Sequence, residues 1–323
     1  MRDRPVVALL GDLNVDVMVR VGEVPAPGGE AHAEASPALG GSAALTARWL
    51  AALGCEVHLA AAVGEDPFGD WLLAALARDG VPTTWIQRAR GDPTGLCLAL
   101  VQRGGERTLL SSPGAARDLR WDRIPESWLD GVDWLHVSGY AWLGGAERQA
   151  ADRAVGLARE RGIPVSLDPG AVAPSLRAAI PSLSLFELVL PNRREVGDLT
   201  GQDDVRAGAD EVRRRGARWV AAKLDRDGCL VASPRGDAAV PGFPVRAKNT
   251  TGAGDAFNAG VIVGVLSGWG PEEVGTLGNL LGAAAVRQGA GGPLPDRGDL
   301  LAFLPGGSTL ARWIEGHWRK EGR

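Results

Sequence analysis

The sequence predicts an α/β fold in which a mostly parallel β-sheet lies between two layers of helices. Two observations carry this prediction: short apolar runs alternate with longer helical patterns along most of the chain, and glycine or proline stands at several of the transitions. Parallel strands need long crossover connections, and helices are the usual ones. A length of 323 residues fits two domains or one large α/β unit, at about 100–200 residues per domain.

The predicted strands are short apolar runs between polar or glycine-containing turns. The first, over residues 5–10, is wholly apolar and ends at Gly11, which is typical of a buried strand. Because charged residues follow this short run at once, we interpret it as a strand and not as a signal peptide. The remaining strands of the alternating pattern are predicted over residues 57–63, 133–137, 163–168, 187–190 and 218–223.

The predicted helices begin and end at residues that suit helix termini. Residues 42–53 form an amphipathic pattern that Gly54 stops. Asp66 and Pro67 supply an N-cap and a first-turn proline for the next helix, which ends before Gly80. The other helices are predicted over residues 146–161, 253–267 and 271–287, with a short one that begins at Asn192.

Two stretches break this alternation. Residues 14–36 and 94–111 are extended in character and contain the glycine pairs 28–29 and 104–105. Their runs VDVMVRV and GLCLALV are rich in residues that favour strands. We therefore predict a small accessory sheet that acts as a lid, with its strands inserted at about 12–38 and 94–114.

Composition and missing motifs exclude several classes of protein. The net charge of −4 provides no basic field, so nucleic acid is not an expected partner. No run of 18 apolar residues occurs, so we expect no membrane partner and a soluble, cytoplasmic protein. None of the three lysines lies in a GK[ST] sequence, and HExxH, GxSxG and a bare GxGxxG after the first strand are missing. The three cysteines lack CxxC spacing and are interpreted as reduced thiols: Cys55, Cys97 and Cys229.

The strongest chemical feature is the run NTTGAGDAF over residues 249–257. Gly252 and Gly254 allow backbone N–H groups to approach a ligand closely, and the apolar helix that follows presents its positive dipole end. Together these features favour phosphate binding. Asp255 lies in the first turn of that helix and could accept a proton from a hydroxyl that attacks the phosphate. A plain glycine-rich turn with Asp255 as an ordinary helix-start residue is the alternative.

Three weaker features stand next to predicted strands or helices. Asn14 and Asp16 are two apart on a strand, so their side chains point the same way, which suits a polyol. Asn192 and Glu195 follow a strand at the end where ligands bind in open α/β sheets. The third feature, directly before a helix, consists of Gly40, Gly41 and Ser42. Each of them also fits an ordinary turn, a strand edge or a solvated helix residue.

Taken in order, these features resemble the PfkB family of carbohydrate kinases, the ribokinase-like proteins, from about Val6 to about Leu304. Residues 40–69 and 248–261 match the two family signatures. Residues 191–201 match the segment between them, and 114–119 match the return from the lid to the core. The resemblance implies one ribokinase-like three-layer α/β/α domain over residues 1–323, with a mostly parallel central sheet and a β-sheet lid that often also forms a dimer contact.

The resemblance implies an ATP-dependent phosphotransferase that acts on a primary hydroxyl of a sugar or related small molecule. Asp255 would be the general base, and Gly252, Ala253 and Gly254 would form an anion hole. A nucleoside kinase of the same family stays open as an alternative. So does a catalytically silent nucleotide-binding regulatory protein.

The same resemblance assigns the remaining site residues and cofactors. Mg²⁺ accompanies ATP, and K⁺ is a further candidate. The expected substrate-binding residues are Asn14, Asp16, Gly40, Gly41 and Ser42. The expected nucleotide-binding residues are Asn192, Lys223, Asp225, Gly228 and Asn279. Glu195, Asn249 and Thr251 are the expected residues of the metal region. From its place after a strand end, with Tyr140, we also expect Trp142 to line the substrate pocket, with a structural role as the alternative.

Four positions depart from the family pattern. Leu45 stands where a substrate-binding asparagine is usual, and Ser42 replaces a common lysine or asparagine, so the ribokinase substrate is in doubt. Asp225 replaces a glycine near the nucleotide and adds a carboxylate there. Asn249 replaces an aspartate that helps to bind a monovalent cation, so we expect weak or absent K⁺ activation.

Overall fold

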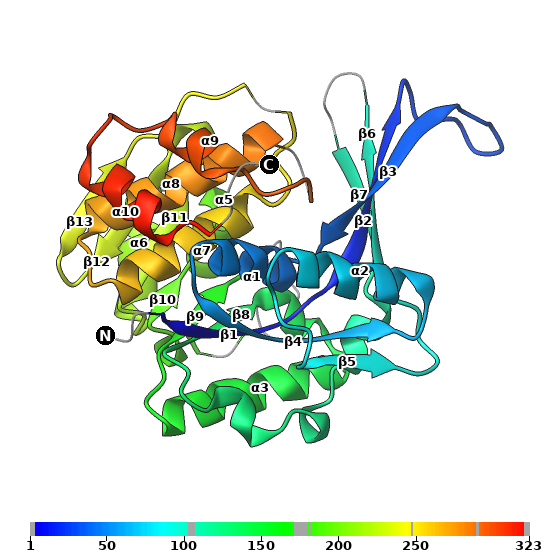
Figure 1. Cartoon of the computed structure of the whole chain (residues 1–323), viewed down its shortest axis with the longest axis horizontal. Coiled ribbons are helices and arrows are strands. Elements are labelled where there is room, and N and C mark those ends of the chain that lie inside the picture. Colours follow the sequence, from blue (N-terminus) through cyan, green and yellow to red (C-terminus); the bar gives the residue numbers. More distant parts are fainter. Residues whose placement is uncertain are drawn as a thin grey trace.

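A nine-stranded sheet forms the centre of the molecule, in the order β13-β12-β11-β10-β9-β8-β1-β4-β5 (Figure 1). In this computed structural model, the described residues are 4–102, 107–170, 180, 182–246, 248–288 and 291–319. All pairs from β5 to β11 are parallel, and the hairpin of β12 and β13 adds two antiparallel strands. The strands are β1 (Val6–Leu10), β4 (Glu56–Gly64), β5 (Ile86–Ala89), β8 (Trp134–Ser138), β9 (Val165–Asp168), β10 (Leu188–Val189), β11 (Trp219–Lys223), β12 (Cys229–Ser233) and β13 (Gly236–Val240).

Strand β1 shows why the sheet must be covered on both faces. All five of its residues are buried. Val7 and Leu9 belong to one hydrophobic cluster, whereas Ala8 and Leu10 belong to another on the opposite face. Successive side chains of a strand point to opposite faces, so a continuous apolar run buries surface on both sides. This arrangement confirms the predicted α/β fold with a large, mostly parallel sheet and a smaller sheet.

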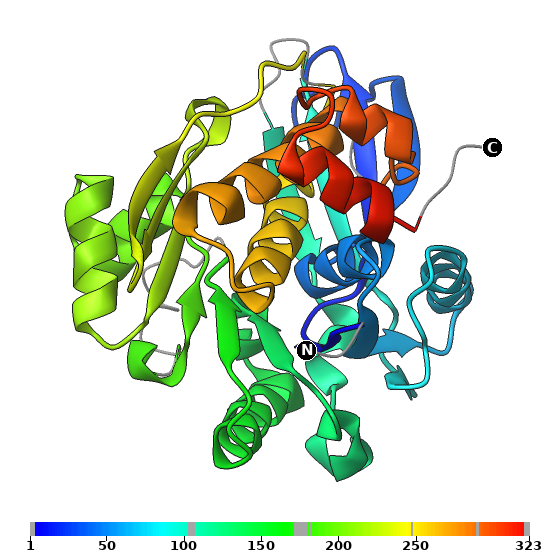
Figure 2. The same cartoon turned by 60° about the vertical axis from the view of Figure 1, so that its left-hand side comes forward.

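Two layers of helices cover the sheet (Figure 2). The first layer shares a hydrophobic cluster and contains α1 (Ser42–Ala52), α2 (Pro67–Arg78), α7 (Ala253–Leu266), α8 (Pro271–Gln288), α9 (Arg297–Leu301) and α10 (Thr309–His317). The second layer contains α3 (Gly145–Glu160), α5 (Arg193–Thr200) and α6 (Val205–Arg214). Short 3₁₀ turns are η1 (Gly114–Asp118), η2 (Trp121–Arg123), η3 (Glu126–Leu129), η4 (Gly139–Leu143), η5 (Leu183–Leu185) and η6 (Asp225–Asp227).

The second sheet has four strands in the order β3-β2-β6-β7 and projects from the main body (Figure 1). Strand β2 pairs antiparallel with β3 and parallel with β6, and β6 pairs antiparallel with β7. Its strands are β2 (Asn14–Val21), β3 (Ala33–Gly40), β6 (Gly95–Val101) and β7 (Arg107–Ser112). Strand β2 begins shortly after the end of β1, and β3 ends directly before α1. Polar residues at the start of β2 therefore lie beside the carboxyl end of β1.

Among the described residues, no helix combines the length and the apolar character needed to cross a bilayer. The three cysteines are free thiols, as predicted, with Cys55 and Cys229 buried and Cys97 partly exposed.

Candidate active site

The carboxyl ends of the parallel strands bring several predicted site residues to one edge of the sheet. Asp168 ends β9 and Lys223 ends β11. Asn192 follows β10 and forms an isolated parallel bridge with Lys223. The N-termini of α1 and α7 meet at the same edge, where Ser42 contacts Asp255. Residues up to 213 positions apart in the sequence therefore share one site.

The loop before α7 has the geometry of an anion site. Gly252 is the N-cap residue of α7, with φ 81° and ψ −4° in the left-handed region that glycine adopts without strain. The N–H of Ala253 donates to Thr250 O at 3.3 Å, and the N–H of Thr251 donates to Asn249 Oδ1 at 2.9 Å. The next N–H groups begin the helix, where backbone donors have no intrahelical acceptor. The loop thus directs donors and the helix dipole toward the site.

Asp255 is held at the entrance of α7 and remains partly exposed. The Ser42 hydroxyl donates to Asp255 Oδ1 at 2.6 Å, which fixes the orientation of the carboxylate. Burial raises the pKa of Asp255 to about 8, and the negative charge of Asp168 adds to this effect. The Ser42 hydrogen bond and the Lys223 charge oppose it. A carboxylate with such a pKa is a much stronger base than an ordinary aspartate.

Lys223, Asp168 and Asn258 form a hydrogen-bonded cluster below the anion loop. The Lys223 ammonium donates to Asp168 Oδ2 at 2.9 Å and to Asn258 Oδ1 at 3.3 Å, and the Asn258 amide donates to the same Asp168 oxygen. Burial alone would lower the pKa of Lys223, but the charges of Asp168 and Glu195 outweigh it and raise that pKa. A Cβ on Gly254 would lie 3.7 Å from Lys223 Nζ, so the ammonium lies next to the loop.

Asn192 and Glu195 form a capping box at the start of α5. The N–H of Glu195 donates to Asn192 Oδ1 at 2.9 Å, and the N–H of Asn192 donates to Glu195 Oε2 at 2.8 Å. The Asn192 amide also donates to Glu195 Oε1 at 2.7 Å. Burial raises the pKa of Glu195 to about 7, with a further contribution from Asp168. The Glu195 carboxylate therefore lies close to the Lys223 cluster. Its two oxygens also accept the hydrogen bonds from Asn192 that cap the N-terminus of α5.

Asn14 and Asp16 lie together at the base of the lid, with the Asn14 amide donating to Asp16 Oδ1 at 2.7 Å. Burial, followed by the charge of Asp12, raises the pKa of Asp16 to about 6. The structure also shows why glycines stand opposite them. A Cβ on Gly40 would overlap the Asp16 carboxylate, and one on Gly41 would overlap Asp12 O.

Trp142 does not line a pocket at this site, which corrects the prediction. Its side chain is 2% exposed and belongs to the hydrophobic cluster under α3. The indole N–H donates to Asp152 Oδ1 at 2.8 Å, and the ring meets Phe186 edge-on with centroids 6.2 Å apart. Trp142 therefore has the structural role, because Asp152 on α3 accepts the hydrogen bond of its buried indole N–H.

The other predicted nucleotide residues are Asp225 and Gly228, in the turn between β11 and β12, and Asn279, within helix α8. Asp225 has a φ of 56°, and in the described part of the chain it is the only residue other than glycine with a positive φ. This backbone conformation explains why a glycine suits position 225. A Cβ on Gly228 would overlap Val240 O. The Asn279 amide donates to Val240 O and Pro241 O, both at 3.1 Å, and so holds the end of β13. These residues shape the loops rather than form one hydrogen-bonded cluster.

Asn249 and Thr251 connect the anion loop to the lid. Asn249 accepts the Thr251 N–H through Oδ1, and its amide lies 3.7 Å from Met18 Sδ on β2. In the part of the chain that the structure describes, no three His, Cys, Asp or Glu side chains are grouped to hold a metal ion.

Three polar residues of the site were missed by sequence reasoning. Asp12 accepts the Ser42 N–H at 2.8 Å and so holds the start of α1. Asn258, which is completely buried, completes the Lys223 cluster. Glu147 is 3% exposed, and burial together with the charge of Asp12 raises its pKa well above the usual value. Signals existed for Asp12, directly after the first strand, and for Asn258, inside the matched residues 248–261, but none for Glu147.

This fold and this site define a ribokinase-like α/β protein. The family model described as "pfkB family carbohydrate kinase" matches residues 5–297. The chain therefore belongs to the PfkB family of carbohydrate kinases.

Curated relatives cover most of the chain. An uncharacterized sugar kinase from Archaeoglobus fulgidus is 34% identical over 245 residues, which span 74% of this chain and 94% of the relative. A ribokinase from Haemophilus influenzae is 29% identical and covers 93% of this chain and 99% of its own length. An ATP-dependent ribose-1-phosphate kinase from Halopiger xanaduensis is 30% identical and covers 91% of this chain and 96% of its own length.

Solved structures share the fold. Arabidopsis thaliana ribokinase, solved with ribose and ATP, superposes with a TM-score of 0.78 at 21% identity, over 93% of this chain and 98% of that one. An Escherichia coli protein described as a ribokinase II, solved with ATP and Mg²⁺, has a TM-score of 0.79 at 24% identity, over 89% and 94% of the two chains.

Proposed function

We propose that this carbohydrate kinase transfers the γ-phosphoryl group of ATP to a primary hydroxyl of a neutral sugar, with Asp255 as the general base. One observation carries the proposal. Asp255 lies partly exposed in the first turn of α7, beside the anion loop, with its carboxylate oriented by Ser42. A base and an anion site at one helix terminus are the parts that phosphoryl transfer to a hydroxyl needs.

In the proposed reaction, the Asp255 carboxylate accepts the proton of the acceptor hydroxyl as its oxygen attacks the γ-phosphorus. The bond between that phosphorus and the β–γ bridging oxygen breaks, and ADP leaves with that oxygen. Backbone N–H groups at the start of α7 donate to the transferring group, whose charge they stabilise. Ser42 keeps one carboxylate oxygen occupied, so Oδ2 is the oxygen that takes the proton.

The donor side is assigned to the loops around Lys223. ATP in the two solved neighbours and the name of the H. xanaduensis relative support ATP as the donor. We assign nucleotide contacts to Asn192, Lys223, Asp225, Gly228 and Asn279. Lys223 brings a buried positive charge next to Gly254, where the β- and γ-phosphates would lie.

Glu195 fits a role in organising Mg²⁺. The ion prefers one or two carboxylates, several waters and substrate phosphates to an all-protein cage, so a single carboxylate such as Glu195 suits it. A neighbouring cation would keep Glu195, whose pKa is about 7, in its charged form. The ion would neutralise charge on the phosphates. Asn249 and Thr251 border this region, and the amide at 249 supports weak or absent K⁺ activation.

The acceptor side favours a neutral polyol over an anion. Asn14 and Asp16 offer hydrogen-bonding groups at the base of the lid, and Asp12 adds a second carboxylate nearby. These charges would repel a sugar phosphate or sugar acid. The relatives include kinases of both kinds, ribokinase and ribose-1-phosphate kinase, so this electrostatic difference discriminates between them. Trp142 is buried, so its ring is not available to stack on a sugar face or on a base.

We further propose that the lid sheet pairs two copies of the chain. Leu109 and Leu110 on β7 are 61% and 55% exposed, and β7 is an edge strand of that sheet. Exposed apolar residues on an edge strand favour association. Sedimentation of the wild type against Leu109→Asp/Leu110→Asp tests this: a dimer that becomes a monomer is expected, and an unchanged mass contradicts it.

ADP release from Mg·ATP, measured across pentoses, hexoses, sugar acids, sugar phosphates and nucleosides, tests the proposed function. We expect a neutral sugar to give the highest kcat/KM and Asp255→Asn to lower its kcat by about 10²–10⁴-fold. Asp70→Asn is the matched control, because Asp70 also lies in a first helical turn but is exposed and distant. A sugar acid or sugar phosphate as the best acceptor would contradict the electrostatic argument. Nucleotide binding without any turnover would support the regulatory alternative.

A further inference from the structure

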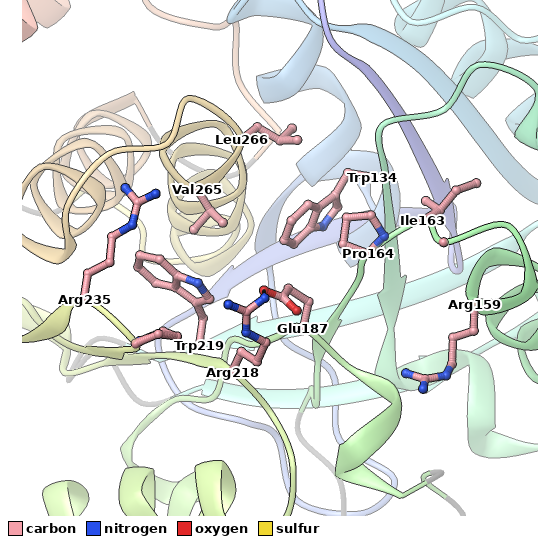
Figure 3. A pocket seen from close by; sticks show the side chains of 12 residues that line it. Trp134, Arg159, Ile163, Pro164, Glu187, Arg218, Trp219, Arg235, Val265 and Leu266 are labelled. Atoms are coloured by element: carbon pink, nitrogen blue, oxygen red, sulfur yellow. Dashed lines mark ion pairs between the residues drawn. The ribbon is translucent and has the colours of Figure 1, made fainter. Parts of the chain in front are cut away.

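Two cavities in the described part of the chain lie near opposite ends of helix α7. The larger one lies at the amino ends of β8, β9, β10 and β11, and Leu266 at the end of α7 lines it (Figure 3). Its residues Arg159 and Arg235 lie on opposite sides of two almost completely buried tryptophans, so they do not form a common anion site. The smaller cavity lies at the other end of α7 and is lined by Thr251 and Gly252 of the anion loop. The smaller cavity is therefore the one that bears on phosphoryl transfer.

Arg48 lines the smaller cavity and is a buried cation. It lies on α1, the helix that begins at Ser42, and its side chain is 3% exposed. Arg48 Nη2 pairs with Asp79 Oδ2 at 2.6 Å, and Asp79, whose side chain is 2% exposed, caps the end of α2. Because each of these buried charges needs the other, the pair fixes the guanidinium between α1 and α2.

The same nitrogen of Arg48 also holds the chain segment 291–294, which follows α8. Arg48 Nη2 donates to Gly292 O at 2.9 Å, although these two residues are 244 positions apart in the sequence. On its other side the segment packs against lid strand β3. Gly291 has a φ of 58°, and a Cβ on it would lie 2.5 Å from Ala38 Cβ. Segment 291–294 is therefore held between the lid and α1.

The anion loop lies against this segment. Thr251 and Gly252 line the smaller cavity together with Arg48 and residues 291–294. The volume of the cavity is about 20 Å³, which holds about one water molecule, so its walls almost touch. Helix α1 also reaches the loop directly, because a Cβ on Gly252 would lie 3.5 Å from Leu45 Cδ1. The position of the segment therefore determines how the anion loop is supported from behind.

We propose that Arg48 is a positioning residue for phosphoryl transfer. Its hydrogen bond to Gly292 O holds segment 291–294 against the anion loop, and so keeps the backbone N–H groups at the start of α7 directed at the transferring group. This inference rests on the proposed function, in which that loop binds the transferring group. A displacement of about 1 Å in such a site can cost about a hundredfold in rate, so a residue behind the loop can control turnover.

Three variants separate the hydrogen bond to Gly292 from the ion pair. Asp79→Asn removes the charge of the partner but keeps Arg48 and its hydrogen bond to Gly292 O. The double variant Arg48→Met/Asp79→Asn removes the guanidinium without leaving an unpaired carboxylate buried, which favours a folded protein. Arg78→Met is the matched control, because Arg78 is exposed and directly precedes Asp79. Thermal unfolding checks that each variant is folded at the assay temperature.

Initial rates with the best acceptor and Mg·ATP give the first measurement. The kcat of the double variant should fall by at least about tenfold, while its KM for the acceptor changes by less than about threefold, because the acceptor residues at the lid keep their places. Asp79→Asn should keep kcat within about threefold of the wild type although its Tm falls. A merely destabilised fold would not produce this difference. Equal kcat losses in the two Asp79 variants, or a double variant that keeps more than about a tenth of the wild-type kcat, would overturn the proposal.

Amide hydrogen exchange over residues 250–256 gives a second measurement, which needs no turnover. The hydrogen-bonded N–H groups of this stretch include those of Thr251, Ala253 and Ala256. They should exchange at least about tenfold faster in the double variant than in Asp79→Asn, whereas the amides of β1 should exchange alike in both. Unchanged exchange over 250–256 would overturn the proposal. Faster exchange in a protein whose wild type phosphorylates no acceptor would support the hold of Arg48 on the loop and contradict the proposed function.

Discussion

The hydroxyl of Ser42 donates a 2.6 Å hydrogen bond to Oδ1 of Asp255, and so joins the first residue of α1 to the first turn of α7. The contact orients the proposed base and also lowers its pKa, against the larger opposing effect of burial. Ser42 therefore links the two signature regions of the sequence in one functional unit.

Ser42→Ala should shift the acidic limb of the pH–rate profile to higher pH. The hydrogen bond favours the charged form of Asp255, so its loss raises the pKa of the base further above about 8. Turnover at pH 7 should fall, by about three- to tenfold, and recover in part at pH 9. Ser127→Ala, on an exposed 3₁₀ turn, should leave the profile unchanged. A profile that keeps its position in Ser42→Ala would exclude this role.

Asp255→Asn should stabilise the fold at neutral pH. The pKa of Asp255 is raised from 3.8 to about 8, so the folded state binds the proton more tightly than the unfolded state. Stability from this group is present below pH 4 and is lost as the pH rises toward 8. Thermal unfolding should show a Tm difference in favour of the variant that is larger at pH 8.5 than at pH 5. A difference that shrinks with rising pH would contradict the shift.

Lys223→Met should destabilise the protein by about 3–5 kcal/mol, because it leaves Asp168 charged, buried and without its cation. Urea unfolding measures this loss. Lys248→Met is the control, since Lys248 is exposed. Adding Asp168→Asn to Lys223→Met should restore part of the stability, because it removes the buried charge. If the changes in unfolding free energy of the two single variants simply add in the double variant, Lys223 and Asp168 are not energetically coupled.

Gly252→Ala should impair catalysis more than stability. The added Cβ would have room, 3.5 Å from Leu45 Cδ1, so the change acts through the positive φ of the anion loop. Gly80→Ala is the matched control, with φ 83° and no neighbour within 4 Å. Both should lose about 1–2 kcal/mol of unfolding free energy, but only Gly252→Ala should lose kcat, by at least about tenfold. Equal kcat losses would exclude a special role for this loop.

Local sequence patterns predict much of the fold and part of the site. The N-terminus of α7 can be predicted from the sequence because the glycines, the helix start and the carboxylate lie within four residues, 252–255. The spacing of Asn192 and Glu195 is likewise local, and the structure places them in a capping box. The β12–β13 hairpin was not predicted, since its strands are short and continue no βα rhythm.

Other parts of the site depend on long-range packing. Asp168 and Lys223 form an ion pair although they are 55 residues apart, and the residues next to each of them in the sequence do not indicate the other. Its position after a strand end suggests that Trp142 lines a pocket. In the structure its buried indole N–H instead donates to Asp152, ten positions later in the sequence. Burial and charge pairing follow from the assembled sheet rather than from neighbouring residues.

The kcat of Asp255→Asn for the best neutral sugar tests the central claim most directly. With Asp70→Asn as the control and saturating Mg·ATP, kcat should fall by about 10²–10⁴-fold while the KM for ATP changes little. The amide keeps the Ser42 hydrogen bond available but cannot accept the proton. A kcat within about tenfold of the wild type would contradict the assignment of Asp255 as the base.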